Sequence, residues 1–220
     1  MSTAQAAASR RGPVPAAGPR GCNCSALAEL GDYVSDRLPS LEPQGAQPVF
    51  SARAGRLLLR GTRVEAEVGP FTLGSISQRI VPADAPSRTV AWSSNLVARS
   101  PSGQRITAET LIRLQTTDAG AVAMDRLFRV LHMLNHLACA REEEALWLPV
   151  SLRHLAGVVR DHGAFFEEVL RQCGLGPERI VLVLQLPVAD SEASAHVVAA
   201  VERYRLRGFR DEQHNPGGAT

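Results

Sequence analysis

The sequence predicts an α/β fold built around a parallel β-sheet. From residue 90 onward, segments with the pattern of strands alternate with segments that have the pattern of helices. This alternation is typical of right-handed βαβ units, which bring successive strands into one parallel sheet. A second observation is the run "RIVLVLQLP" at 179–187, which is apolar, rich in β-branched residues and of strand length. Runs of this kind are typical of parallel strands that are buried on both faces.

Composition limits the class of protein. The chain has 220 residues, a length that suits one domain with a tail, and 45% of them are hydrophobic, which allows a sizeable core. The formal net charge is +2 and the charges are mixed, so the basic stripe expected of a nucleic-acid-binding protein is missing. No secretory signal follows Met1 and no apolar stretch could span a membrane. Four cysteines form no disulfide framework, so we expect a reduced, cytoplasmic protein.

The chain divides into three parts. Residues 1–43 are rich in Ala, Pro and Gly and poor in large apolar residues, which predicts a flexible leader. Residues 44–210 form the predicted domain, in which 47–81 is a β-rich segment and 90–210 carries the βα units. The polar end "DEQHNPGGAT", residues 211–220, predicts a disordered tail.

The elements follow from periodicity. In "TRVEAEVGPFTL", apolar and charged residues alternate with the period of a half-buried strand. "TVAWSSNLVA" predicts another strand, Pro101–Gly103 a turn, and "RITAETLIRL" a further strand that contains Glu109. "AVAMDRLFRVLHMLNHLACA" has apolar residues at spacings of three and four and predicts a helix.

The remaining elements complete the alternation. "ALWLPV" predicts a short strand, and "SLRHLAGVVRDHGAFFEEVLRQC" a helix that is interrupted near Gly163 and ends at Gly174. "DSEASAHVVAAVERYRLRGF" predicts the last helix, which ends at Gly208. The run Glu142–Glu144 is interpreted as a solvated helix end.

Several of these segments resemble one family. "SGQRITAETLIR" contains Glu109-Thr110-Leu111, which is similar to the Glu-Ala-Leu motif of EAL domains, with Arg113 and Gly103 at the family's spacing. "MDRLFRVLHMLNHL" resembles the family's Leu-Asp-Arg helix, "GLGPERIVLVL" the segment that leads into its third strand, and "YRLRGF" a later helix end. EAL domains are (β/α)8 barrels that hydrolyse cyclic di-GMP. The resemblance therefore implies a partial TIM-like (β/α) barrel, because an entire barrel needs about 250 residues.

The same resemblance tests the chemistry residue by residue. The family binds Mg²⁺ or Mn²⁺ through carboxylate and amide oxygens at the ends of several strands. Glu109 would be one metal ligand, and Arg113 would contact a ligand phosphate. Pro149 stands at the family's Asn, and Val183 and Leu186 stand at its two acids; none of these three side chains can bind a cation. Glu109 is therefore interpreted as a relic ligand, with an ordinary strand acid as the alternative.

The sequence favours a degenerate, non-catalytic EAL-like domain that binds a protein partner or itself and regulates cyclic di-GMP signalling. Weak binding of cyclic di-GMP stays open, and no cofactor is expected. An active phosphodiesterase that uses Mg²⁺ or Mn²⁺ and a non-functional truncated fragment are the alternatives. A competing register starts at "QPVFSARAGRL" and places Gly61 at the motif's Glu. His132 and His136, four residues apart on one helix, are interpreted as surface or packing residues rather than metal ligands.

Overall fold

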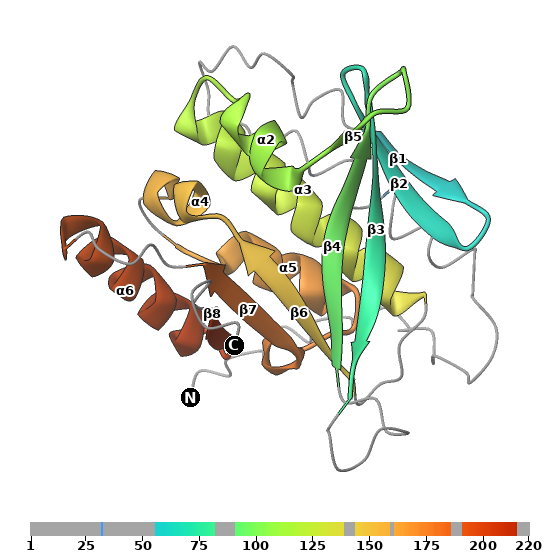
Figure 1. The fold of residues 1–220 in the computed structure, drawn as a ribbon. Coiled ribbons are helices and arrows are strands. Elements are labelled where there is room, and N and C mark those ends of the chain that lie inside the picture. The colour runs from blue at the N-terminus through green and yellow to red at the C-terminus, as the bar shows by residue number, and fades with distance from the viewer. Residues whose placement is uncertain are drawn as a thin grey trace, which may run out of the picture.

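One sheet organises the chain in the computed structural model (Figure 1). The structure describes residue 32 and residues 56–81, 91–138, 144–158, 161–185 and 191–214. Apart from Asp32, the predicted leader lies outside these residues. The strands are β1 (Arg56–Arg60), β2 (Arg63–Val68), β3 (Phe71–Ile80), β4 (Ala91–Arg99), β5 (Arg105–Ile106), β6 (Ala145–Val150), β7 (Ile180–Gln185) and β8 (Arg210–His214). The helices are α2 (Ala108–Arg113), α3 (Asp118–Leu137), α4 (Leu152–Gly157), α5 (Ala164–Gln172) and α6 (Ser191–Leu206), with a 3-10 turn, η3, at Pro177–Arg179.

The strand pairing in the sheet changes from antiparallel to parallel at β4. Its order is β1-β2-β3-β4-β6-β7-β8, and β5 pairs only with the end of β4. β1 to β4 are antiparallel neighbours, whereas β4, β6, β7 and β8 are parallel. The predicted parallel sheet is confirmed for this second part. The predicted β-rich segment is confirmed too, because its strands extend the sheet on the outer side of β4.

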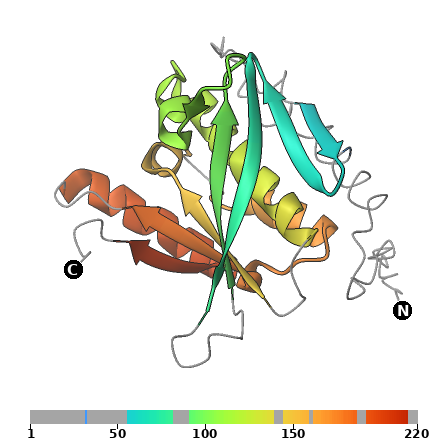
Figure 2. The ribbon, with the colours of Figure 1, turned by 45° about the vertical axis from the view of Figure 1, so that its right-hand side comes forward.

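The described helices pack against one face of the sheet (Figures 1 and 2). The main core lies between them and the sheet and includes Leu146 and Leu148 of β6 and Leu182 of β7. Because side chains alternate along a strand, Trp147 and Val181 point to the opposite side, where they pack with Ala91, Ala145 and Ile80. We call this opposite side, which also holds Pro149 and Val183 by alternation, the far face.

Local chemistry explains two helix boundaries: the predicted interruption near Gly163 is confirmed, whereas α3 begins at Asp118, before the Ala121 expected from the sequence. α3 begins after Thr117, whose side chain accepts a hydrogen bond from the Gly120 N–H at 3.0 Å, as an N-cap residue does. The predicted interruption near Gly163 separates α4 from α5, since Gly163 has a φ of 82°. Glycine adopts this left-handed conformation without strain, and the chain changes direction there before α5 begins.

Three predictions are wrong. The strand expected at "RITAETLIRL" is limited to Arg105–Ile106, and Ala108–Arg113 is helical because the Thr107 side chain caps the Thr110 N–H at 3.1 Å. Residues 211–214 of the predicted tail belong to β8, which pairs with β7. Glu144 is not at a solvated helix end: it is 9% exposed, and its Oε2 accepts a 2.8 Å hydrogen bond from Trp92 Nε1.

Candidate functional site

The predicted Glu109 and Arg113 lie on the surface of α2. Their side chains are 78% and 71% exposed, and the nearest charged atoms of the two are 3.9 Å apart, at positions i and i+4 of the helix. Exposed pairs of this kind contribute little stability, on the order of 0.3–0.5 kcal/mol. Glu109 thus does not stand on a strand. Among the described residues, no group of three or more His, Cys, Asp or Glu is arranged to hold a metal ion.

Pro149 and Val183, two of the three positions at which the sequence lacks the family's metal ligands, lie in the carboxyl-terminal half of the parallel strands β6 and β7. Pro149 of β6 is the register partner of Val183 of β7, and Val183 is the register partner of Glu212 of β8. Pro149 and Val183 point to the far face, because Leu148 and Leu184, their neighbours along the strands, belong to the main core. Glu212 points to the same face, because it is the register partner of Val183. Leu186 lies outside the described residues. The far face therefore carries proline and valine on two adjacent strands and one carboxylate on the third.

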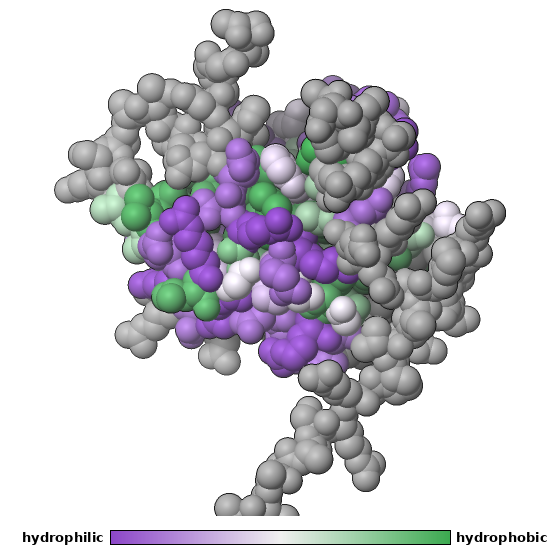
Figure 3. All heavy atoms as spheres, turned by 90° about the horizontal axis from the view of Figure 1, so that it is seen from below, coloured by the Kyte–Doolittle hydropathy of each residue, from purple (hydrophilic) through white to green (hydrophobic). Residues whose placement is uncertain are grey.

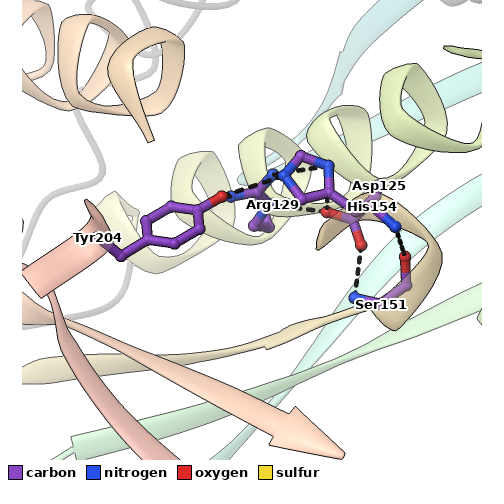
Figure 4. A network of polar contacts seen from close by, with 5 residues as sticks. All are labelled: Asp125, Arg129, Ser151, His154 and Tyr204. Atoms are coloured by element: carbon purple, nitrogen blue, oxygen red, sulfur yellow. Dashed lines mark hydrogen bonds and ion pairs between the residues drawn. The ribbon is translucent and has the colours of Figure 1, made fainter. Parts of the chain in front are cut away.

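The most organised polar cluster lies on the helical side instead (Figure 4). It consists of Asp125, Arg129, Ser151, His154 and Tyr204, which come from α3, the start of α4 and α6. Asp125 Oδ2 and Arg129 Nε are 3.0 Å apart, and Asp125 Oδ1 accepts a 2.9 Å hydrogen bond from the Ser151 N–H. One carboxylate therefore connects α3 to the N-cap residue of α4.

The cluster reaches α6 through the guanidinium. Arg129 NH1 donates to the Tyr204 hydroxyl oxygen at 3.2 Å, and Arg129 NH2 lies 3.0 Å from His154 Nε2. His154 Nδ1 lies 3.4 Å from Asp125 Oδ2. Arg129 NH2 also lies 3.4 Å from His154 Nδ1, and His154 Nε2 lies 3.0 Å from the Tyr204 hydroxyl, so the tautomer of the imidazole decides which ring nitrogen accepts from the guanidinium.

Burial sets the charges of this cluster. It lowers the pKa of His154 well below its usual value, with a further contribution from Arg129, so the imidazole is neutral at pH 7. Burial also raises the pKa of Asp125, while Arg129 and the Ser151 N–H oppose that shift. Arg129, His154 and Tyr204 are each 1% exposed. Groups buried to this extent are not accessible to a ligand, so the cluster connects three helices rather than forming a binding site.

Part of this cluster has a signal in the sequence. Asp125 and Arg129 stand four residues apart on the predicted helix, and opposite charges at this spacing meet on one face. The contributions of His154 and Tyr204 had no comparable signal, because they lie 25 and 75 residues away from Arg129 in the chain.

His132 and His136 are packing residues, which confirms one of the two predicted interpretations. They are 1% and 3% exposed. His132 Nδ1 and the Ser75 hydroxyl are 2.7 Å apart, so the ring bonds to β3. Burial lowers the pKa of His132 to about 4, and burial together with Arg179 lowers the pKa of His136 to about 4. Both rings are therefore neutral at pH 7.

The surface offers few large apolar side chains. Seen from below, the described residues are mostly hydrophilic, with small apolar areas between them (Figure 3). The exposed large apolar residues in the described part of the chain are Ile76, Val81, Leu114, Val198 and Leu206. No helix among the described residues is long and apolar enough to cross a membrane.

An open, mixed sheet whose parallel part is covered by helices on one face corresponds to part of a TIM-like barrel. No protein-family model matches this sequence, and no curated protein matches it. The fold is similar to that of the Bacillus subtilis YkuI protein, which has an EAL domain and was solved with cyclic di-GMP and calcium. The TM-score is 0.51 and the identity 16%, over 67% of this chain and 36% of that chain.

A second structure with a similar fold is Klebsiella pneumoniae BlrP1, solved as a calcium and cyclic di-GMP complex at pH 8.0. Its TM-score is 0.51 and its identity 14%, over 88% of this chain and 45% of that chain. This chain thus spans less than half the length of either structure. At such low identity the likeness shows an EAL-like fold, and it shows the fold alone.

Proposed function

We propose that this chain is a degenerate, non-catalytic EAL-like domain that acts as a protein-binding regulator in bacterial cyclic di-GMP signalling. The fold supports the EAL-like part of the proposal. The observation that carries the non-catalytic part is the pairing of Pro149 with Val183 on adjacent parallel strands.

The argument rests on what these two side chains can do. In a barrel, catalytic ligands come from the carboxyl ends of several strands and converge on one point. Mg²⁺ and Mn²⁺ need several oxygen ligands, and activation of water for attack at phosphorus uses one or two such ions. Pro149 and Val183 have no side-chain oxygen, so β6 and β7 supply no ligand at this pair. Glu212 on β8 is one carboxylate, and one carboxylate cannot hold a two-metal site.

Glu109 does not replace the metal ligands that β6 and β7 lack. It lies on α2 with a 78% exposed side chain, beside Arg113, and not on a strand of the sheet. A chain without a metal site can still act through contacts of its surface, so we propose regulation through a protein partner.

The test is an incubation of the purified full chain with cyclic di-GMP and either Mg²⁺ or Mn²⁺. We expect no linear product above the level of a protein-free control, in a chain that circular dichroism shows to be folded. The Glu109→Gln variant is measured alongside. Metal-dependent turnover by the native chain would contradict the non-catalytic assignment; its loss in Glu109→Gln would then identify Glu109 as a ligand.

A further inference from the structure

The two ends of the sheet differ in their suitability for pairing with another chain. β1 and β8 are the terminal strands, and neither pairs with a further strand among the described residues. β8 has the sequence Arg-Asp-Glu-Gln-His, and such polar, charged edges are a known protection against unwanted strand pairing. β1 has three consecutive leucines between two arginines. β1 is therefore the edge that can accept another strand.

The register shows which backbone groups of β1 point outward. β1 and β2 are joined by a two-residue loop, so Arg60 and Arg63, which flank it, form a hydrogen-bonded pair. The next pair, Leu59 and Val64, is then a non-hydrogen-bonded pair, in which the N–H and C=O groups of each residue point away from the other strand. The same holds for Leu57 and its partner Ala66.

A contact on the opposite side of the hairpin supports this assignment. The Val64 N–H donates to Asn135 Oδ1 at 3.1 Å, and Asn135 Nδ2 donates to the Val64 C=O at 2.8 Å. The Val64 groups thus point away from β1 and toward α3, as the register requires. By the same geometry, the Leu57 and Leu59 groups point to the outer edge of β1, ready to bond to an added strand.

The charges beside the outer edge of β1 determine which kind of added strand binds there. Arg60 and Arg63 are register partners, and both are exposed. Neither forms an ion pair with a residue that the structure describes. Like charges directly opposite each other on antiparallel strands are destabilising, and an anionic group beside them relieves the repulsion. The two arginines at the hairpin end therefore form a cationic site, with Glu65 on the same face by this register, next to a strand edge that pairs with no further strand among the described residues.

We infer that the outer edge of β1 binds an acidic, extended segment of a partner protein by strand addition. The inference rests on the proposed function and adds to it the chemistry of the partner. Backbone bonds to Leu57 and Leu59 supply the affinity, and a carboxylate beside Arg60 and Arg63 supplies the selectivity.

The test uses the full chain and two labelled seven-residue peptides of alternating Thr and Val. One carries Glu at both ends and the other Lys at both ends. We expect fluorescence anisotropy at low salt to show binding of the acidic peptide about tenfold tighter than of the basic one. In the variant Arg60→Glu/Arg63→Glu, the preference should reverse. Arg105→Glu, which changes an exposed arginine on β5, is the matched control and should keep the preference of the native chain.

Hydrogen exchange identifies the edge that is used. The acidic peptide should slow exchange at the Leu57 and Leu59 amides. Equal binding of both peptides, or a preference that survives the double charge reversal, would overturn the inference. So would Leu57 and Leu59 amides that are protected in the free chain, or a chain that dimerises through β1 in place of binding peptide. Hydrolysis of cyclic di-GMP would refute the proposed function alone, and a chain that neither hydrolyses it nor binds the acidic peptide would refute this inference alone.

Discussion

Replacing Asp125 with Asn should lower the free energy of unfolding by about 3–5 kcal/mol, because it leaves the buried Arg129 guanidinium without its anionic partner. The two side chains are 4% and 2% exposed, and their charged atoms are 3.0 Å apart. The amide that replaces the carboxylate can still accept the Ser151 N–H, so the loss reports the charge more than the hydrogen bond. Urea unfolding followed by circular dichroism measures the effect.

The matched control lies on the same helix. Asp118 of α3 pairs with Arg153 at 3.0 Å, but the Asp118 side chain is 69% exposed. Asp118→Asn should therefore cost no more than about 1 kcal/mol. Adding Arg129→Met to Asp125→Asn should recover part of the loss, since the unpaired charge is then removed with its partner. Equal costs for Asp125→Asn and Asp118→Asn would show that burial does not govern the pair.

Acid should destabilise the chain through its neutral histidines. The pKa of His132 is about 4 in the folded chain, and an unfolded histidine has a pKa of about 6.5. Between these values the unfolded chain binds the proton and the folded chain does not. Stability therefore rises with pH across this window, is fully present above about pH 6.5, and is lost as the pH falls toward 4. The contribution of His132 alone is on the order of 3 kcal/mol.

Urea unfolding at a series of pH values from 4 to 8 tests this linkage. His132→Gln should flatten the dependence of the free energy of unfolding on pH, because glutamine does not titrate. The difference between native chain and variant removes the contribution of carboxylates that titrate in the same window. A native chain and variant with parallel profiles would mean that His132 takes up its proton equally in both states.

The sequence could predict the elements whose pattern depends on burial. The core strand β7 and the helices α3 and α5 have apolar residues at the period of their structure, because each buries one or two faces. α2 was missed since it has six residues, too few for a helical period to outweigh the β-branched residues around it. Its signal was the cap, with Thr107 three residues before Thr110.

β8 was missed for a different reason, which is that it has no apolar residues. As a terminal strand it has one neighbour, and its sequence is polar throughout, so it carries no apolar alternation. The candidate site, too, could be predicted only in part from the sequence. Pro149 and Val183 could be named from sequence, but their placement as register partners follows from the pairing of β6 with β7. The error at Glu109 arose because a motif of three residues does not distinguish a strand from a helix.

The change of strand direction at β4 has a consequence for how the chain folds. β1 to β4 are neighbours in both sequence and space, so hairpin formation brings each pair together at a small cost in loop entropy. β4, β6, β7 and β8 are joined through helices, so each pairing must first close a longer loop, which slows it. Only Ala91–Ser93 of β4 register with Ala145–Trp147 of β6. We therefore expect substitutions in β3 to slow refolding and substitutions in β7 mainly to speed unfolding, a division that φ-values in the two halves would measure.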